Sequence, residues 1–127
     1  MFDVNIHCIV FGVNETLNKR CVLSIDDKEI ILPHFKLTQN LLDNINENII
    51  KFLNEYVLVN PLELIPQLIN IHHNSLKTTD NSLDITYGFV IDYRSNINPS
   101  KAYWIDFDPM KETKISLVLF ETMQKLS

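Results

Sequence analysis

The stretch Leu32–Val57, LPHFKLTQNLLDNINENIIKFLNEYV, decides the fold. Its second half carries apolar residues three and four positions apart: Leu42, Ile45, Ile49, Phe52, Leu53 and Tyr56. This spacing predicts one long amphipathic helix, with polar residues on the opposite face. Thr38 or Asn40 is the expected N-cap, and Asn60-Pro61 is a stop signal shortly after the helix.

Three strands are expected before this helix. Val4–Val13 alternates two sets of mostly apolar residues, which is typical of a strand buried largely on both sides. Arg20–Ile25 and Glu29–Leu32 are predicted as two more strands, and the tight turn Asp26-Asp27-Lys28 would join them as a hairpin.

Three more strands are expected after the helix: Gln67–Asn74, Leu83–Tyr93 and Ala102–Phe107. Asp108-Pro109 resembles the entry of a closing helix, a cap followed by Pro at the first helical position. The predicted order is β-β-β-α-β-β-β-α. It defines an α+β fold, with a mixed β-sheet between two main helices, in a single domain over residues 1–127.

The composition excludes several classes of function. A net charge of −5 does not provide the basic surface that phosphate contacts need, so nucleic acid is not expected as the main ligand. Neither a membrane span nor a signal peptide is recognisable. Cys8 and Cys21 lack metal-ligand spacing and are expected as free thiols in a reducing compartment, with a cross-strand disulfide as the alternative. The expected location is the cytoplasm, or a particle such as a virion assembled there.

Two sequence features add to the order of elements. Leu32-Pro33 leads into a loop and the first helix, and Trp104-Ile105-Asp106-Phe107-Asp108 places a Trp-bearing strand before the last helix. With these features the whole chain resembles the Nudix family. In Nudix hydrolases a Gly-rich turn precedes a helix that carries an Arg-Glu pair and then a Glu-Glu pair. Those carboxylates bind Mg²⁺ or Mn²⁺, which activate water against a diphosphate.

The motif residues of the family are missing from the matching positions. With Leu32-Pro33 as the anchor, the substitutions are His34 and Phe35 for two glycines, Leu41 for the first glutamate, Ile49 and Ile50 for Arg-Glu, Leu53 and Asn54 for Glu-Glu, and Tyr56 for a late glycine. Apolar and amide side chains cannot hold a divalent cation. The resemblance therefore implies a degenerate Nudix-like domain with no metal, no cofactor and no hydrolase activity.

Three aspartates are the candidates for a relocated metal site. Asp106 and Asp108 lie two positions apart at a strand end, and Asp92 ends a strand that is expected to be the neighbour. The simpler interpretation leaves Asp106 exposed and makes Asp108 the cap of the last helix. The three aspartates are the basis of the alternative function, a Nudix-like hydrolase or nucleotide-binding protein with a relocated site.

Histidines and cysteines provide two weaker candidates. His72-His73 are adjacent on a predicted strand, so their side chains face opposite sides and do not bind one ion together. Cys8 or Cys21 could contact His7 or His34, because all four lie in or beside the first three strands. No nucleophile elbow accompanies them, so buried and inert cysteines are the preferred interpretation.

Tyr87, Tyr93 and Tyr103 are the interface candidates, on two strands that are expected to lie close together. Without Lys and Arg around them, a protein partner fits better than a stacked base. The sequence therefore predicts a non-catalytic structural or assembly component of a larger protein complex or homo-oligomer. Abundant Asn and Ile beside one Ala and two Gly indicates an AT-rich coding sequence, which suggests a virus or phage particle.

Overall fold

The computed structural model describes residues 3–14, 19–38, 43–74, 82–92 and 96–106. Within them the strands are β1 (Asp3–Asn14), β2 (Lys19–Ser24), β3 (His34–Leu37), β4 (Gln67–Asn74), β5 (Ser82–Asp92) and β6 (Tyr103–Asp106). The helices are α2 (Ile45–Leu53) and the 3-10 turn η1 (Pro61–Glu63). The α+β prediction with a mixed sheet is confirmed, whereas the predicted closing helix lies outside the described residues.

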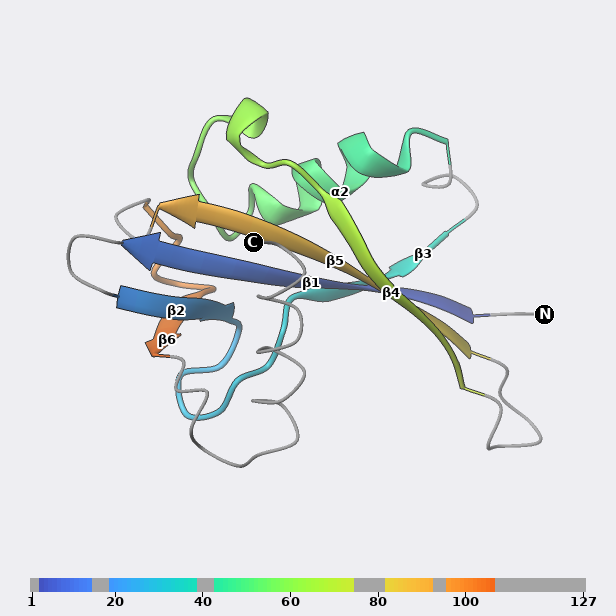
Figure 1. Ribbon diagram of the computed structural model, residues 1–127, viewed down its shortest axis with the longest axis horizontal. Coiled ribbons are helices and arrows are strands. Elements are labelled where there is room, and N and C mark those ends of the chain that lie inside the picture. The colour runs from blue at the N-terminus through green and yellow to red at the C-terminus, as the bar shows by residue number, and fades with distance from the viewer. Residues whose placement is uncertain (1–2, 15–18, 39–42, 75–81, 93–95, 107–127) are drawn as a thin grey trace.

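The strands form one mixed sheet in the order β4-β5-β1-β2-β6, and β3 pairs with β1 at its other end (Figure 1). At the centre β1 and β5 run parallel from Asp3↔Ser82 to Val13↔Asp92. All the other pairings are antiparallel. The central parallel pair therefore joins strands from opposite halves of the chain, and α2 and β4 lie between them in sequence.

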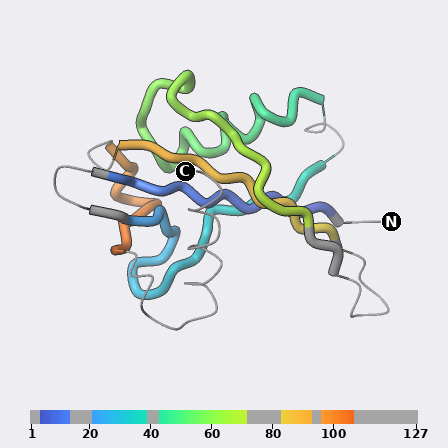
Figure 2. The backbone as a smooth tube through the Cα atoms, in the orientation of Figure 1, coloured from blue at the N-terminus to red at the C-terminus, as the bar shows by residue number. Residues whose placement is uncertain are grey.

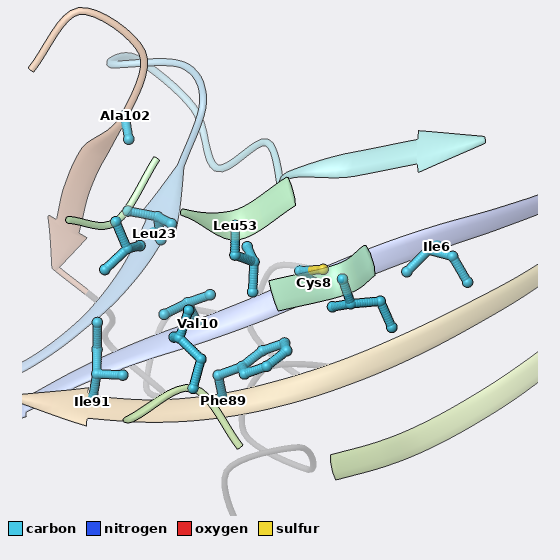
Figure 3. Packing of buried hydrophobic residues seen from close by; sticks show 11 residues of the cluster. Ile6, Cys8, Val10, Leu23, Leu53, Phe89, Ile91 and Ala102 are labelled. Carbon is cyan, nitrogen blue, oxygen red and sulfur yellow. The ribbon is translucent and has the colours of Figure 1, made fainter. Parts of the chain in front are cut away.

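Helix α2 covers one face of this sheet, where the larger hydrophobic core lies. Alternate residues of β1, Ile6, Cys8 and Val10, are fully buried there with Ile49 and Leu53 of the helix. Figure 3 shows Cys8, Val10 and Phe89 lying beside Leu53. The opposite face carries a smaller cluster of Ile9, Phe11 and Val22. The two-sided burial predicted for the first strand is thus confirmed.

The observed helix is shorter than the predicted one. It begins after Asn44, which has a left-handed backbone (φ 60°) and makes no side-chain cap bond. Asn44 therefore takes the N-cap position predicted for Thr38 or Asn40. After Leu53 the chain leaves the helix, and Figure 2 shows it returning to the sheet as β4. The bridge between Val57 and Ile97 and the bond from Leu58 N to Asn96 O fix this exit.

The predicted strand Glu29–Leu32 is wrong, and so is the predicted hairpin. Residues 25–33 form a loop around the buried Ser24, whose Oγ lies 2.8 Å from Asp26 O and 3.0 Å from Glu29 O and accepts from Ile31 N at 2.9 Å. The Asp26 carboxylate accepts from Lys28 N and Glu29 N, so these two side chains provide hydrogen-bond partners for much of the loop backbone. The third strand is β3, and it pairs with β1 from Val4↔Leu37 to His7↔His34.

Gly12 marks a close approach between β1 and the single tryptophan. A Cβ at Gly12 would lie 2.9 Å from the indole carbon Cη2 of Trp104. Trp104 is opposite Leu23 in the β2–β6 pairing and packs against the larger core cluster. A glycine within a strand often marks such a close approach, because it has no side chain to displace.

Candidate functional site

The α2 positions that correspond to the metal-binding motif of Nudix hydrolases lie in or beside the hydrophobic core. Ile49 and Leu53 are 0% exposed, and Ile50 is half-buried against the same cluster. Asn54 Nδ2 donates to Val57 O at 3.2 Å and to Val59 O at 3.3 Å, so its amide holds the helix exit. These four positions therefore pack the sheet or fix the backbone.

The acids of the helix region do not converge on one point. Glu47 lies exposed in the first turn of α2. Glu55 lies beyond the C-terminal end and faces Lys101 Nζ at 3.9 Å. Beside Glu55, Tyr56 packs edge-on against Phe52, and burial together with the Glu55 charge raises the pKa of Tyr56. In the described part of the chain, no group of three His, Cys, Asp or Glu side chains could hold a metal ion.

Two of the three aspartates proposed for a relocated site, Asp92 and Asp106, lie apart. Asp92 ends β5 and Asp106 ends β6, but β1 and β2 lie between these strands. Three strand spacings separate the two by about 14 Å, which is too far for shared metal ligation. The expectation that their strands are neighbours is wrong. Asp106 is exposed and accepts a hydrogen bond from Cys21 Sγ at 3.2 Å, and Asp108 lies outside the described residues.

Two of the three tyrosines predicted to form an interface, Tyr87 and Tyr103, also lie apart. Tyr87 on β5 is half-buried against the larger core cluster. Tyr103 on β6 is exposed, but it lies opposite Ser24 of β2, and strands β1 and β2 separate β6 from β5. Tyr93 lies outside the described residues. Tyr87 and Tyr103 therefore do not share one docking surface.

Cys8 and Cys21 are both buried, and no disulfide joins them. The main-chain partner of Cys21 is Gly12, four residues along β1 from Cys8, so about 13 Å separates the two positions along the strand. A disulfide between them would need Cα atoms within about 7 Å. Burial raises the pKa of the Cys8 thiol to about 12, so Cys8 is not a nucleophile at neutral pH.

A polar cluster that the sequence did not reveal lies on the sheet face opposite α2. The Asp84 carboxylate contacts His7 Nε2 at 3.2 Å and accepts from Asn5 Nδ2 at 3.3 Å. The rings of His7 and His34 stack at 5.8 Å, and His34 Nδ1 lies 2.9 Å from Leu32 O. Because the imidazoles stack, their nitrogens do not converge as metal ligands would. The cluster links β3, β1 and β5.

Exposed apolar side chains gather in one segment that the sequence did not single out. The large hydrophobic residues exposed in the described chain are Leu58, Leu62, Ile65, Leu68, Ile71, Val90 and Tyr103. The first five fall within residues 58–71, which contain η1 and enter the edge strand β4. Leu62 is 85% exposed. A concentration of this kind is typical of an interaction surface. The only sequence signal was the poor fit of residues 61–66 to helix or strand.

Comparison with known proteins identifies the fold. No family model and no curated protein sequence matches the chain. Among solved structures, the NUDIX domain of Shewanella oneidensis NrtR, complexed with ADP ribose, matches with a TM-score of 0.62 at 13% identity, over 97% of this chain and 86% of that chain. Intact NrtR gives a TM-score of 0.69 at 12% identity, and the match covers 97% of this chain and 63% of NrtR.

Two further structures have the same fold. The C-terminal domain of mouse MUTYH, in complex with human PCNA, has a TM-score of 0.63 at 12% identity, over 98% of this chain and 88% of that chain. The Ap4A hydrolase of C. elegans has a TM-score of 0.60 at 8% identity, over 100% of both chains. The chain therefore has the Nudix fold, as its resemblance implied. Among the described residues, no helix combines the length and apolar character that a bilayer crossing requires.

Proposed function

We propose that this chain is a non-catalytic Nudix-like domain that acts by binding other proteins, as a structural or assembly component of a larger complex. The observation that carries the proposal is the burial of the α2 positions that correspond to the Nudix motif. Ile49 and Leu53, at positions where the resemblance implies charged motif residues, are fully buried, and Asn54 secures the helix exit. A carboxylate placed at Ile49 or Leu53 would lie in the core without solvation.

The exposed apolar segment supports a protein partner. Five large hydrophobic side chains within residues 58–71 remain in contact with solvent, and burial of such surface drives association. A protein partner of a chain with this fold has a precedent, since the MUTYH domain was solved with PCNA. NrtR was solved with a 27mer DNA, but the net charge of −5 disfavours that ligand class for this chain. The amino-acid composition is what supports a virus or phage particle as the assembly.

The second candidate function is Nudix-type hydrolysis, which the similarity to an Ap4A hydrolase over the full length of both chains favours. One assay separates the two functions. The purified chain is incubated with ADP-ribose and Ap4A in Mg²⁺ or Mn²⁺, and product formation is followed by chromatography. Thermal unfolding is measured with and without each metal.

Under our proposal there is no turnover above buffer and no metal-dependent shift in Tm, and native purification yields the chain with itself or with other proteins. Metal-dependent cleavage of a pyrophosphate bond overturns the proposal. The Asp106→Asn variant then tests whether Asp106 belongs to a relocated site, because this exposed residue can be changed without entering the core.

A further inference from the structure

Strand β4 forms one end of the main strand order. It pairs with β5 along one side, and among the described strands none pairs with its other side (Figure 1). An edge strand presents a row of N–H and C=O groups to any extended chain that approaches it. Proteins usually protect such an edge with charged residues, with Pro, with β-bulges, or by keeping the strand short.

Of these protections, β4 has a bulge but neither charged residues nor Pro. Its eight residues, QLINIHHN, contain no Asp, Glu, Lys, Arg or Pro. Leu68 and Ile71 are 56% and 54% exposed. The register slips between Leu68 and Asn70, which makes Ile69 an extra residue. Because of this bulge, Leu68 lies opposite Tyr87 and Ile71 opposite Ile85, so both lie on the same face of the sheet.

We propose that β4 pairs with β4 of a second copy of this chain, antiparallel across a two-fold axis, so that one sheet continues through both molecules. This inference rests on the proposed function and identifies the protein partner as a second copy of the chain. In the register that places Leu68 opposite Ile71 of the second copy, symmetry creates that apolar pair twice on one face. This arrangement is self-complementary, as an isologous interface requires.

The absence of Asp, Glu, Lys and Arg from β4 allows a second copy of the chain to approach along this edge. Each molecule carries a net charge of −5, so two copies repel one another at most approaches. The neutral edge of β4 brings no like charges together. The same edge does not attract a basic or an acidic peptide electrostatically, because it carries no Asp, Glu, Lys or Arg.

Strand pairing is the core of this interface, and the apolar residues that precede it extend the buried area. A stable dimer buries roughly 1,200–2,000 Å² in total. Leu62 and Ile65 lie directly before β4 and are 85% and 67% exposed. They are the side chains available to enlarge the contact.

The test is the mass of the chain in solution, measured by analytical ultracentrifugation over a range of concentrations. The wild type should sediment as a dimer. The Leu68→Lys variant should weaken dimerisation at least 10-fold, because two ammonium groups then lie at the shared edge. Val90→Lys is the matched control, since Val90 is 46% exposed on the neighbouring strand β5, and this variant should remain dimeric. Circular dichroism confirms that each variant is folded.

Hydrogen exchange gives a second measurement. Amides of residues 67–72 should gain protection as the concentration rises, whereas the exposed loop at 26–29 should not change. A monomeric wild type, or a dimer that Leu68→Lys leaves intact, overturns the inference. A monomer that binds an extended peptide along β4 also overturns it, while leaving the proposed protein-binding function in place. Diphosphate turnover by a dimer would instead overturn the proposed function alone.

Discussion

At the scale of single residues, Leu53 takes the position of a motif glutamate in the Nudix resemblance, but its side chain packs in the core. It is fully buried among strands β1 and β5 and the end of α2. Truncation to Ala should lower the free energy of unfolding by about 2–5 kcal/mol, because it removes buried methyl groups and leaves a cavity. Urea titration measures the difference.

Leu58→Ala is the matched control for this truncation. Leu58 has the same side chain five residues later but is mostly exposed, so its loss should change the free energy of unfolding by about 0.5 kcal/mol or less. Equal effects at the two positions would show that Leu53 does not pack in the core.

Cys8 is the residue whose chemistry depends most on burial. Its pKa of about 12 lies above the usual 9.0, so at pH 8 the native chain holds about 1,000-fold less thiolate at this site than the unfolded chain. In the Cys21→Ser variant Cys8 is the only thiol, and its reaction with a disulfide reagent should be slower by a similar factor until urea is added. Reaction at the unfolded rate would place Cys8 outside the core.

The same pKa gives a pH dependence of stability. Because the folded pKa is raised, the thiol favours the folded state fully below pH 9, and this contribution is lost as the pH rises toward 12. Stability should therefore fall faster above pH 9 in the wild type than in Cys8→Ala, each compared with its own value at pH 7.

At the scale of elements, the contact between β1 and β6 depends on the missing side chain of Gly12. Gly12→Ala places a methyl group 2.9 Å from the Trp104 ring and should destabilise the chain by about 1–3 kcal/mol. The smaller side chain in Trp104→Leu should relieve the clash. The double variant should then show less than the sum of the two single losses in thermal unfolding, and strict additivity would contradict the contact.

The sequence predicts well the elements whose residues carry a strong pattern. Gln67–Asn74 has the predicted bounds, β1 differs from its prediction by one residue at each end, and β5 begins one residue before its predicted start. Glu29–Leu32 failed because alternation cannot reveal that the Ser24 hydroxyl satisfies that backbone. Strand β3 was missed because its residues were assigned to the loop that leads into the helix.

The candidate sites were harder to predict because they depend on strand order. Asp92 and Asp106 seemed close because their strands follow one another in sequence, but β1 and β2 lie between them. The contact of His7 with Asp84 spans 77 positions and requires the parallel β1–β5 register. No local pattern gives that register, whereas the burial of Ile49 and Leu53 followed directly from helical spacing.

At the scale of the whole molecule, dimerisation should appear as a dependence of Tm on concentration. Two chains separate when a dimer unfolds, so mass action raises Tm as the protein concentration increases. Differential scanning calorimetry over a hundredfold range should show this rise for the wild type and a constant Tm for Leu68→Lys. A constant Tm for the wild type together with a rise for Leu68→Lys would show that pairing at the β4 edge does not contribute to thermal stability.

The parallel pairing of β1 with β5 also has a consequence for synthesis on the ribosome. The first strand emerges early, but its main partner, residues 82–92, follows almost seventy residues after β1 ends. Until then the apolar β1 can pair only locally, with β2 and β3. Contacts between residues this far apart in the sequence slow folding, and the partly folded intermediates expose apolar surface that tends to aggregate. The nascent chain is thus a natural client for chaperones until its fifth strand has left the exit tunnel.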